Sequence, residues 1–341
     1  MNLPINYLMP ILAIIVMPVL LMLLRKVSFK IGLVDVPNTR KIHSESIPLV
    51  GGLALFIMSC LLLVFHEDTD SFIFFLMLAS GLVMLVGLLD DIFQLSSFWR
   101  FMVQIIASIV MIYFAQVQIN SFGYLLFPQW EMHLGYLAVP VTIFGVVGVI
   151  NALNMADGID GLAVVTFFLP AAVLCVLTND SLIQLWLVFL LICLGVFLIF
   201  NKSSKYKVFL GDNGSMFLGF ILAWLLVKLS QGSTAVILPV SALYLVALPI
   251  YDTIFVMLRR IKAGVSPFRP DKSHLHHLFL ASGFSQTKTL FAILLSQLFL
   301  IAIGWVLAVV EVAEYLQFYL FVALSIGYYL VMQNYWKLKQ T

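Results

Sequence analysis

Long apolar segments follow one another along almost the whole chain, separated by short polar breaks. We find eleven, at 5–24, 49–65, 71–89, 98–116, 135–151, 161–178, 181–200, 213–229, 234–256, 289–309 and 314–332. A helix needs roughly 20 residues to cross a bilayer, which is close to the length of most of these segments. Only 10% of the 341 residues are charged, against about 25% in a soluble domain. We therefore expect an all-α integral membrane protein with about 11 transmembrane helices, forming a single polytopic domain over residues 1–341.

The basic residues predict the orientation of these helices. The first apolar segment has no basic residue before it and is followed by Arg25 and Lys26, which is opposite to a cleavable signal peptide. With the N-terminus outside and eleven crossings, 17 of the 18 basic residues fall on the cytoplasmic side, and only Lys228 lies near the outside. We predict a retained first helix, an outside (periplasmic) N-terminus and a cytoplasmic C-terminus. All three cysteines lie in predicted spans, where we expect no disulfide.

Polar side chains collect in five segments at the cytoplasmic ends of the predicted helices, and the outer ends carry no comparable cluster. The first segment runs from Asp35 to Gly52. Its Arg40 and Lys41 are suited to hold phosphate, and Gly51 and Gly52 at a helix start permit close backbone approach to an anion. The alternative is a positively charged anchor, followed by glycines that serve helix packing.

The second segment is the acidic pair Asp90-Asp91, at the end of the third apolar segment. Neighbouring residues on a helix point about 100° apart, so the two carboxylates cannot form one chelating face unless the helix has ended. We expect one of them to meet a metal or substrate while the other orients it. A solvated helix end is the alternative.

The third segment has a polar residue at every third position: Asn151, Asn154, Asp157 and Asp160. Residues three apart are neighbours on a helical or 3₁₀ surface, and two glycines in the segment permit a tight turn. Two amides and two acids at the rim of a membrane span are poorly suited to packing. This series is therefore a strong candidate for a functional site.

The fourth segment places Asp212 near the start of the eighth apolar segment. A carboxylate is a hard oxygen ligand, and Mg²⁺ commonly takes one or two of them while water and phosphate oxygens complete its shell. A simple helix N-cap is the alternative.

The fifth segment holds His274, His276 and His277, with Arg269 and Lys272 beside them. Zinc is disfavoured because no cysteine is available and the surrounding carboxylates are hard ligands. Anion binding or proton transfer suits the segment better, and a solvated loop is the alternative.

Together the five segments combine carboxylates suited to Mg²⁺, basic residues suited to phosphate and a body embedded in lipid. That combination predicts phosphoryl transfer between a water-soluble donor and a lipid acceptor. A transporter or lipid flippase is the main alternative, but its path should leave polar groups at mid-bilayer, where this chain offers little beyond Pro170, Pro249 and Asp252. A structural scaffold would not explain the Asn/Asp series. The net charge of +2 gives no reason to expect a nucleic-acid partner.

These segments, in this order, resemble the polyprenyl-phosphate N-acetylhexosamine-1-phosphate transferases (glycosyltransferase family 4), closest to the branch that transfers N-acetylglucosamine 1-phosphate to undecaprenyl phosphate. The resemblance implies a multi-pass enzyme of the bacterial cytoplasmic (inner) membrane with its active site on the cytoplasmic face. It implies UDP-N-acetylhexosamine and undecaprenyl phosphate as substrates, UMP as a product, and Mg²⁺, or Mn²⁺ in its place, as cofactor. A homodimer is one option for its assembly.

The resemblance also implies roles for individual residues. Implied metal ligands are Asn154 and Asp212. Implied catalytic residues are Asp90, Asp91, Asp157, His274, His276 and His277. Implied substrate-binding residues are Arg40, Lys41, Asp160, Asn201, Phe209, Gly211 and Arg269, with Phe209 and Asp160 similar to residues that receive the uracil.

The donor sugar and the pathway stay open. The His-Leu-His-His arrangement is closer to the acetylglucosamine branch than to the muramoyl-pentapeptide transferases, whose three histidines are consecutive. UDP-N-acetylglucosamine is therefore the expected donor, with a modified UDP-N-acetylhexosamine or a muramoyl-pentapeptide donor as alternatives. The product could serve lipopolysaccharide O-antigen, enterobacterial common antigen, teichoic acid or another cell-wall glycan.

Overall fold

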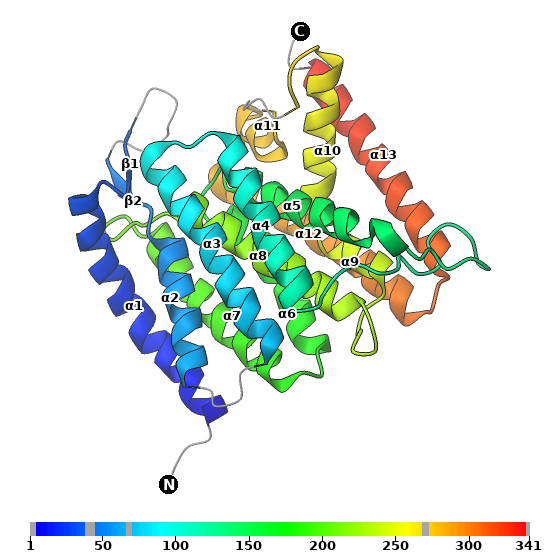
Figure 1. Ribbon diagram of the computed structural model, residues 1–341. Helices are drawn as coiled ribbons and strands as arrows, with labels where there is room; N and C mark the ends of the chain where they lie inside the picture. The colour runs from blue at the N-terminus through cyan, green and yellow to red at the C-terminus, as the bar shows by residue number, and fades with distance from the viewer. Residues whose placement is uncertain (1–4, 38–44, 66–69, 268–272, 339–341) are drawn as a thin grey trace.

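The chain folds into a bundle of tilted helices with one short strand pair, as the computed structural model in Figure 1 shows. The structure describes residues 5–37, 45–65, 70–267 and 273–338. The first half contains α1 (Ile5–Ile31), β1 (Val34–Asp35), β2 (Ile47–Pro48), α2 (Gly51–Val64), α3 (Ser71–Phe93), α4 (Ser97–Phe114), a 3₁₀ turn (Gly135–Leu137) and α5 (Ala138–Ala156). The second half contains α6 (Leu162–Leu177), α7 (Ser181–Lys202), α8 (Gly211–Ser230), α9 (Pro239–Leu245), α10 (Ala247–Lys262), α11 (Leu275–Ala281), α12 (Gln286–Val309) and α13 (Glu314–Leu338).

Each predicted apolar segment overlaps a helix, except that 234–256 covers two, α9 and α10. In the described part of the chain, eight helices are long and apolar enough to cross a membrane, and the α9–α10 pair, bent by 76°, would make a ninth. Helices α2 and α6 are shorter, with 14 and 16 residues. The all-α membrane architecture is confirmed, while the count of eleven crossings and the orientation of the termini stay predictions.

The bend between α9 and α10 has a local cause. Pro249 stands in the first turn of α10, where it has no N–H to donate to the carbonyl of Leu245. Its ring is also incompatible with an uninterrupted helix, so the chain ends α9 and begins again at Ala247 in a new direction. The single continuous helix expected over 234–256 is therefore wrong.

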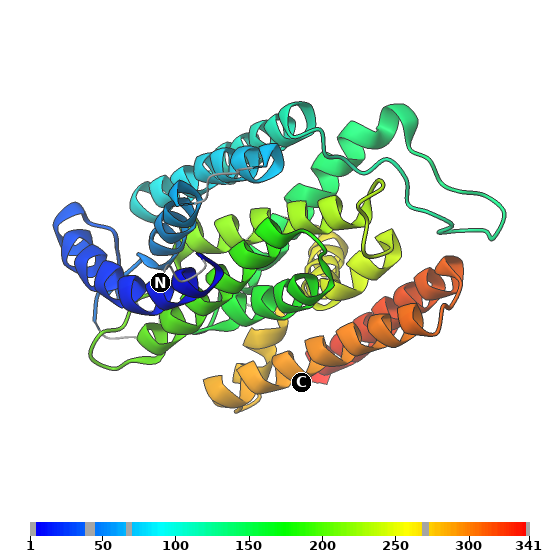
Figure 2. The same cartoon turned by 90° about the horizontal axis from the view of Figure 1, so that it is seen from below.

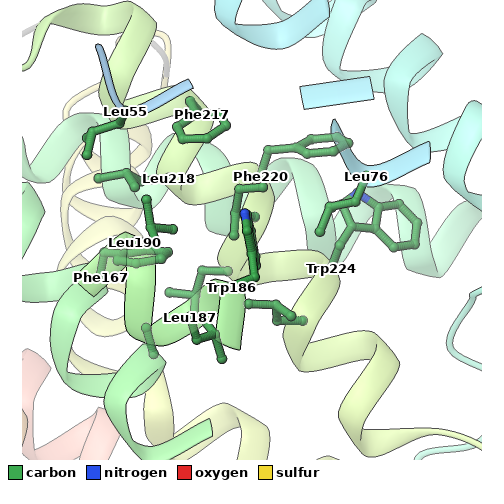
Figure 3. Close-up of a cluster of buried hydrophobic side chains, with 14 of the residues drawn as sticks. Leu55, Leu76, Phe167, Trp186, Leu187, Leu190, Phe217, Leu218, Phe220 and Trp224 are labelled. Atoms are coloured by element: carbon green, nitrogen blue, oxygen red, sulfur yellow. The ribbon is translucent and has the colours of Figure 1, made fainter. Parts of the chain in front are cut away.

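Helix α8 is the centre of the bundle, and α2, α3, α5 and α6 pack against it. Nearly all of its residues are buried, as expected for a helix that is apolar on every side. Figure 3 shows Phe217 of α8 beside Leu55 of α2, and Trp224 of α8 beside Leu76 of α3. At the edge away from α3 and α4, helices α12 and α13 pack on α9 and α10 (Figure 2).

Close contact between α2 and α8 depends on glycine. A Cβ atom added to Gly52 would overlap the backbone of Gly214, so the two helices approach closely at this point. Small residues at a helix crossing permit such packing in membrane proteins. All three cysteines, in α2, α6 and α7, are free, as predicted.

The connections predicted to face the cytoplasm meet at one end of the bundle. The β1–β2 pair, the α3–α4 connection, the end of α10 and α11 lie together at the top of Figure 1, and the first residues of α1 lie at the other end. The alternation of helix directions therefore brings segments from the whole chain to a single face.

Candidate active site

A cavity of about 900 Å³ opens at this end of the bundle. The end of α3, the α5–α6 turn, the segment before α8 and the end of α11 form its walls. Nine predicted site residues line it: Asp90, Asp91, Asp157, Asp160, Asn201, Phe209, Gly211, Asp212 and His277. The predicted residues Arg40, Lys41 and Arg269 lie outside the described residues, as does Lys272.

Asp212 lies in the first turn of α8 and is held by α5. The side-chain amide of Asn154 donates hydrogen bonds to Asp212 Oδ1 at 2.7 Å and to the Ser215 hydroxyl at 2.9 Å. The two predicted metal ligands are therefore direct neighbours. The carboxylate of Asp212 is 40% exposed, which leaves it accessible from the cavity.

Asp91 accepts hydrogen bonds from backbone N–H groups at the start of α8, which have no partner within the helix. Its two carboxylate oxygens accept hydrogen bonds from the backbone N–H groups of Asp212 (2.9 Å) and Asn213 (3.1 Å), and from the Asn213 side chain (2.6 Å). A negative charge at a helix N-terminus is favourable because it offsets the helix dipole. Asp91 therefore fixes the position of Asp212.

Asp90 is buried, and Arg100 from the first turn of α4 neutralises it. The Arg100 guanidinium is 3.0 Å from Asp90 Oδ2 and 3.9 Å from Asp212 Oδ2. The alternative of a solvated helix end is therefore wrong for Asp90, which is only 6% exposed. Arg100 is not among the predicted site residues, although it is the first basic residue after the acidic pair.

The polar series at 151–160 is divided between a helix and a turn. Asn151 bonds Gln104 of α4 at 2.7 Å, inside the bundle, and Asn154 faces α8. Helix α5 ends at Ala156, so Asp157 and Asp160 lie in the turn before α6. The expectation of one shared helical surface is therefore wrong.

The turn carries a carboxyl group whose pKa is strongly perturbed. Burial, together with the carboxylates of Asp212, Asp91 and Asp160, raises the pKa of Asp157 well above its usual range. A group under such strong like-charge influence, in a cavity wall, is a functional-site candidate.

Lys207 links the turn to the segment before α8. Its ammonium group is 2.6 Å from Asp160 Oδ2 and 5.3 Å from the centre of the Phe209 ring. It therefore neutralises Asp160 beside an aromatic surface. Lys207 is not among the predicted substrate-binding residues, although it lies two residues before Phe209 in the same segment.

The segment before α8 is hydrogen-bonded through its backbone to the start of α2. The N–H groups of Gly51 and Gly52 donate to the carbonyls of Phe209 and Leu210, and the Phe209 N–H donates to Pro48. The hypothesis that these glycines bind an anion through their N–H groups is wrong, because protein carbonyls already occupy those donors. Asn201 supports the same segment, because its side-chain amide donates a 2.9 Å hydrogen bond to the Val208 carbonyl. Its buried Oδ1 has no hydrogen-bond partner among the described residues.

The three histidines have different surroundings. His277 lines the cavity, whereas His274 and His276 are buried behind it. His274 Nδ1 lies 2.8 Å from Asp252 of α10. His276 Nε2 is buried against Gly158 of the α5–α6 turn and has no hydrogen-bond partner in the part of the chain that the structure describes. Burial and the neighbouring His277 and His274 lower the pKa of His276 to about 3. A solvated loop, the alternative for this segment, is therefore wrong for His274 and His276.

The donor set suits a hard divalent cation. Among the described residues, six aspartates line the cavity, and Arg100 and Lys207 are ion-paired with two of them, Asp90 and Asp160. Among the described residues, no three His, Cys, Asp or Glu side chains form a ready metal cage. A cation held here would therefore take few protein ligands and complete its shell with water and substrate oxygens, as Mg²⁺ does.

Comparison with known proteins identifies relatives of this chain. Residues 73–230 match the model of the family described as Glycosyl transferase family 4. An undecaprenyl-phosphate alpha-N-acetylglucosaminyl 1-phosphate transferase of Salmonella typhi is 36% identical over 293 residues, which cover 84% of this chain and 79% of that protein. The protein of the same name from Yersinia pestis is 39% identical over 82% of this chain and 78% of its own length. The one from Haemophilus influenzae is 32% identical over 93% and 91%.

Proposed function

Because the chain belongs to glycosyl transferase family 4, we propose that it transfers N-acetylglucosamine 1-phosphate from a UDP-sugar to undecaprenyl phosphate and releases UMP. The sugar phosphate and the lipid acceptor in this proposal are those in the names of the relatives described above. The observation that carries it is the cavity in which Asp212, Asp157 and Asp160 meet Lys207 and Phe209 at one end of an apolar bundle. We expect a cavity in this position to receive a lipid from the bilayer and a nucleotide from water.

The chemistry is an exchange of one phosphoanhydride for another. A phosphate oxygen of undecaprenyl phosphate attacks the β-phosphorus of the UDP-sugar, the bond to the bridging oxygen breaks, and UMP leaves. A phosphate monoester is largely ionised at pH 7, since its second pKa is near 6, so the attacking oxygen needs no strong base. The protein then has to position two anions and neutralise their charge.

Mg²⁺ is the cofactor we propose, with Asp212 and Asn154 as its protein ligands. When bound, the ion would neutralise charge on the phosphates of both substrates. Asp91 holds the backbone of Asp212 in place through α8. Asp90 is paired with Arg100, whose guanidinium also lies near Asp212 and is suited to a phosphate oxygen.

The nucleotide end of the cavity is assigned to the α5–α6 turn and the segment before α8. Phe209 offers an aromatic face for the uracil, and Asp160 and Asn201 offer acceptor oxygens for its single N–H, at N3. The orphan Oδ1 of Asn201 supports this assignment, because a buried acceptor without a partner is suited to a ligand donor. His277 lines the same cavity, where it is suited to contact the diphosphate or the sugar.

A transporter is less consistent with these observations. The polar cavity lies at one end of the bundle, while α8 continues through the centre with Phe217, Phe220 and Trp224 fully buried among apolar side chains. A path for a polar solute would need polar groups along that core. We place the enzyme in the bacterial cytoplasmic membrane with the cavity facing the cytoplasm.

The decisive experiment uses the purified full-length protein in detergent with undecaprenyl phosphate and radiolabelled UDP-N-acetylglucosamine. We expect label in the organic-phase lipid, one UMP for each lipid product, and loss of both when EDTA removes divalent cations. Release of UDP would indicate transfer of the sugar alone and would overturn the proposal, as would the absence of labelled lipid. A panel with UDP-N-acetylgalactosamine and a UDP-muramoyl-pentapeptide tests the choice of donor.

A further inference from the structure

Asp252 of α10 receives three polar contacts at the base of the histidine segment. Its Oδ2 lies 2.8 Å from His274 Nδ1, and its Oδ1 accepts hydrogen bonds from the Leu275 N–H and the Tyr328 hydroxyl, both at 2.9 Å. The carboxylate is only 14% exposed and does not line the cavity. The transfer chemistry described above gives it no task.

This carboxylate joins three elements that are far apart in sequence. It belongs to α10, Leu275 is the first residue of α11, and Tyr328 belongs to α13. A mostly buried carboxylate is costly unless its oxygens are hydrogen-bonded, so its three partners favour one arrangement of these elements. The start of α11 is therefore fixed to α10 and α13.

The contacts continue from Asp252 to the cavity through a row of imidazole rings. The rings of His274 and His276 are parallel within 9° at 6.1 Å, and the rings of His276 and His277 are 4.1 Å apart. His276 also lies against Gly158, where an added Cβ atom would overlap its ring. His277, the last of the three, is the one that lines the cavity.

We propose that Asp252, assisted by Tyr328, is a positioning residue for the transfer reaction, and that it acts by anchoring α11 so that His277 faces the cavity. The inference rests on the proposed function, because its effect on transfer has meaning only if the protein catalyses that transfer. The anchoring itself is a structural property and is measurable without any substrate.

Hydrogen–deuterium exchange of the full-length protein in detergent tests the anchoring. In Asp252→Ala, the Leu275 N–H and the Tyr328 hydroxyl lose their acceptor, and we expect exchange of the α11 amides to rise about tenfold. Asp252→Asn keeps an acceptor oxygen for them and should show a smaller rise. Tyr328→Phe removes one donor only and gives a second, milder variant should the alanine variant fold poorly.

Asp180→Asn is the matched control. The Asp180 carboxylate also accepts two backbone N–H groups at a helix start, both at 3.0 Å, but it does so at α7 and away from the cavity. We expect it to leave the exchange of α11 and the transfer rate unchanged. Unchanged α11 exchange in Asp252→Ala would overturn the proposal.

Transfer kinetics test whether the anchoring matters to the reaction. We expect kcat to fall about tenfold in Asp252→Asn and about 100-fold in Asp252→Ala, the range typical of residues that support a functional side chain. In a His277→Ala background the same changes should add less than about threefold, since the side chain they position is gone. If the Asp252 and His277 substitutions instead lowered kcat by independent factors that multiply, the positioning role of Asp252 would be refuted.

The two possible failures are distinguishable. If the wild-type protein produces no labelled lipid, the proposed function fails whatever Asp252 does, and the exchange experiment still decides the anchoring. If the wild-type protein is active and Asp252→Ala keeps its kcat, the positioning role is wrong and the proposed function stands.

Discussion

The side-chain amide of Asn154 donates a 2.7 Å hydrogen bond to the carboxylate of Asp212, across the packed pair of helices α5 and α8. The two residues are 58 positions apart in the chain. Their contact unites the polar series of one helix end with the acidic start of another, and it is the geometrical centre of the proposed metal site. Predictions about catalysis, stability and pH follow from this arrangement.

Asp212→Asn should lower the transfer rate at least about 100-fold with folding intact, because the amide keeps the shape of the side chain but loses its charge. The rate of labelled lipid formation, measured across a Mg²⁺ titration, checks this. Asp70→Asn, at the opposite end of α3, is the control and should be fully active. Normal Mg²⁺-dependent turnover in Asp212→Asn would refute the metal assignment.

Arg100→Ala should destabilise the protein by about 1–3 kcal/mol, because it leaves the buried Asp90 carboxylate without its cation. Thermal unfolding followed by tryptophan fluorescence measures the change. The double variant Arg100→Ala/Asp90→Asn should recover part of the loss, since the uncompensated charge is gone. Arg25→Ala removes an exposed 3.4 Å contact with the Lys205 carbonyl and a 5.7 Å contact with the Phe29 ring, and should change stability by less than about 1 kcal/mol. Equal effects of the two arginine substitutions would contradict this account.

Gly52→Ala should destabilise the bundle by about 1–3 kcal/mol, because the added methyl group would overlap the backbone of Gly214. Gly195→Ala in α7 is the matched control, since no atom lies within 4 Å of the position its Cβ would take. Alanine is about 0.5–1 kcal/mol better than glycine within a helix, so this control should be neutral or stabilising. The measurement is the melting temperature of each variant relative to the wild-type protein. Equal melting temperatures of Gly52→Ala and Gly195→Ala would contradict the prediction.

His276 makes stability depend on pH. Its pKa is lowered to about 3 in the folded protein, against about 6.5 in the unfolded chain. As the pH falls below 6.5, His276 takes up a proton in the unfolded state but stays neutral in the folded state. The free energy of unfolding therefore decreases between about pH 6.5 and 3. At pH 5 this loss is about 2 kcal/mol.

The measurement is the difference in melting temperature between pH 7.5 and pH 5. His276→Gln should show a smaller difference than the wild-type protein. His133→Gln, at an exposed position, should behave like the wild type. A wild-type pH dependence that survives unchanged in His276→Gln would show that other groups cause it.

UMP should reverse the reaction. Because one phosphoanhydride replaces another, the proposed transfer is near balance, and added UMP should inhibit net transfer and regenerate UDP-sugar from isolated lipid product. Chromatography of the nucleotides after incubation with labelled lipid product measures this. Failure of any back-reaction in active, purified enzyme would count against direct exchange of UMP for the lipid phosphate.

The apolar segments of the sequence predicted the positions of most helices correctly. The apolar segments coincide with helices because a backbone in lipid must satisfy its own hydrogen bonds, which leaves few alternatives to a helix. The interruption at Val246 was missed, although Pro249 carried its signal. Polar groups at a membrane rim are costly without a task, which is why the clusters at 90–91, 151–160 and 209–212 are predicted to form a site. The structure brings members of all three clusters to one cavity.

The roles within the clusters were harder to predict, because they depend on which groups meet across helices. Gly51 and Gly52 have the composition of an anion site, yet their N–H groups serve the carbonyls of Phe209 and Leu210. Asp90 and Asp91 are adjacent in sequence and have different partners, Arg100 for one and the start of α8 for the other. No local pattern distinguishes these outcomes.

The sequence by itself determined the class of this protein: its long apolar segments require a helical membrane body, and its polar segments mark the ends where chemistry is expected. Only the tertiary structure decided which polar groups share a cavity, which support others from behind it, and that His277 lines the cavity while His274 is bound to Asp252. The reason is physical. Hydrophobicity acts on each segment locally, whereas hydrogen bonds and ion pairs need particular atoms within about 3 Å, and only helix packing sets that distance.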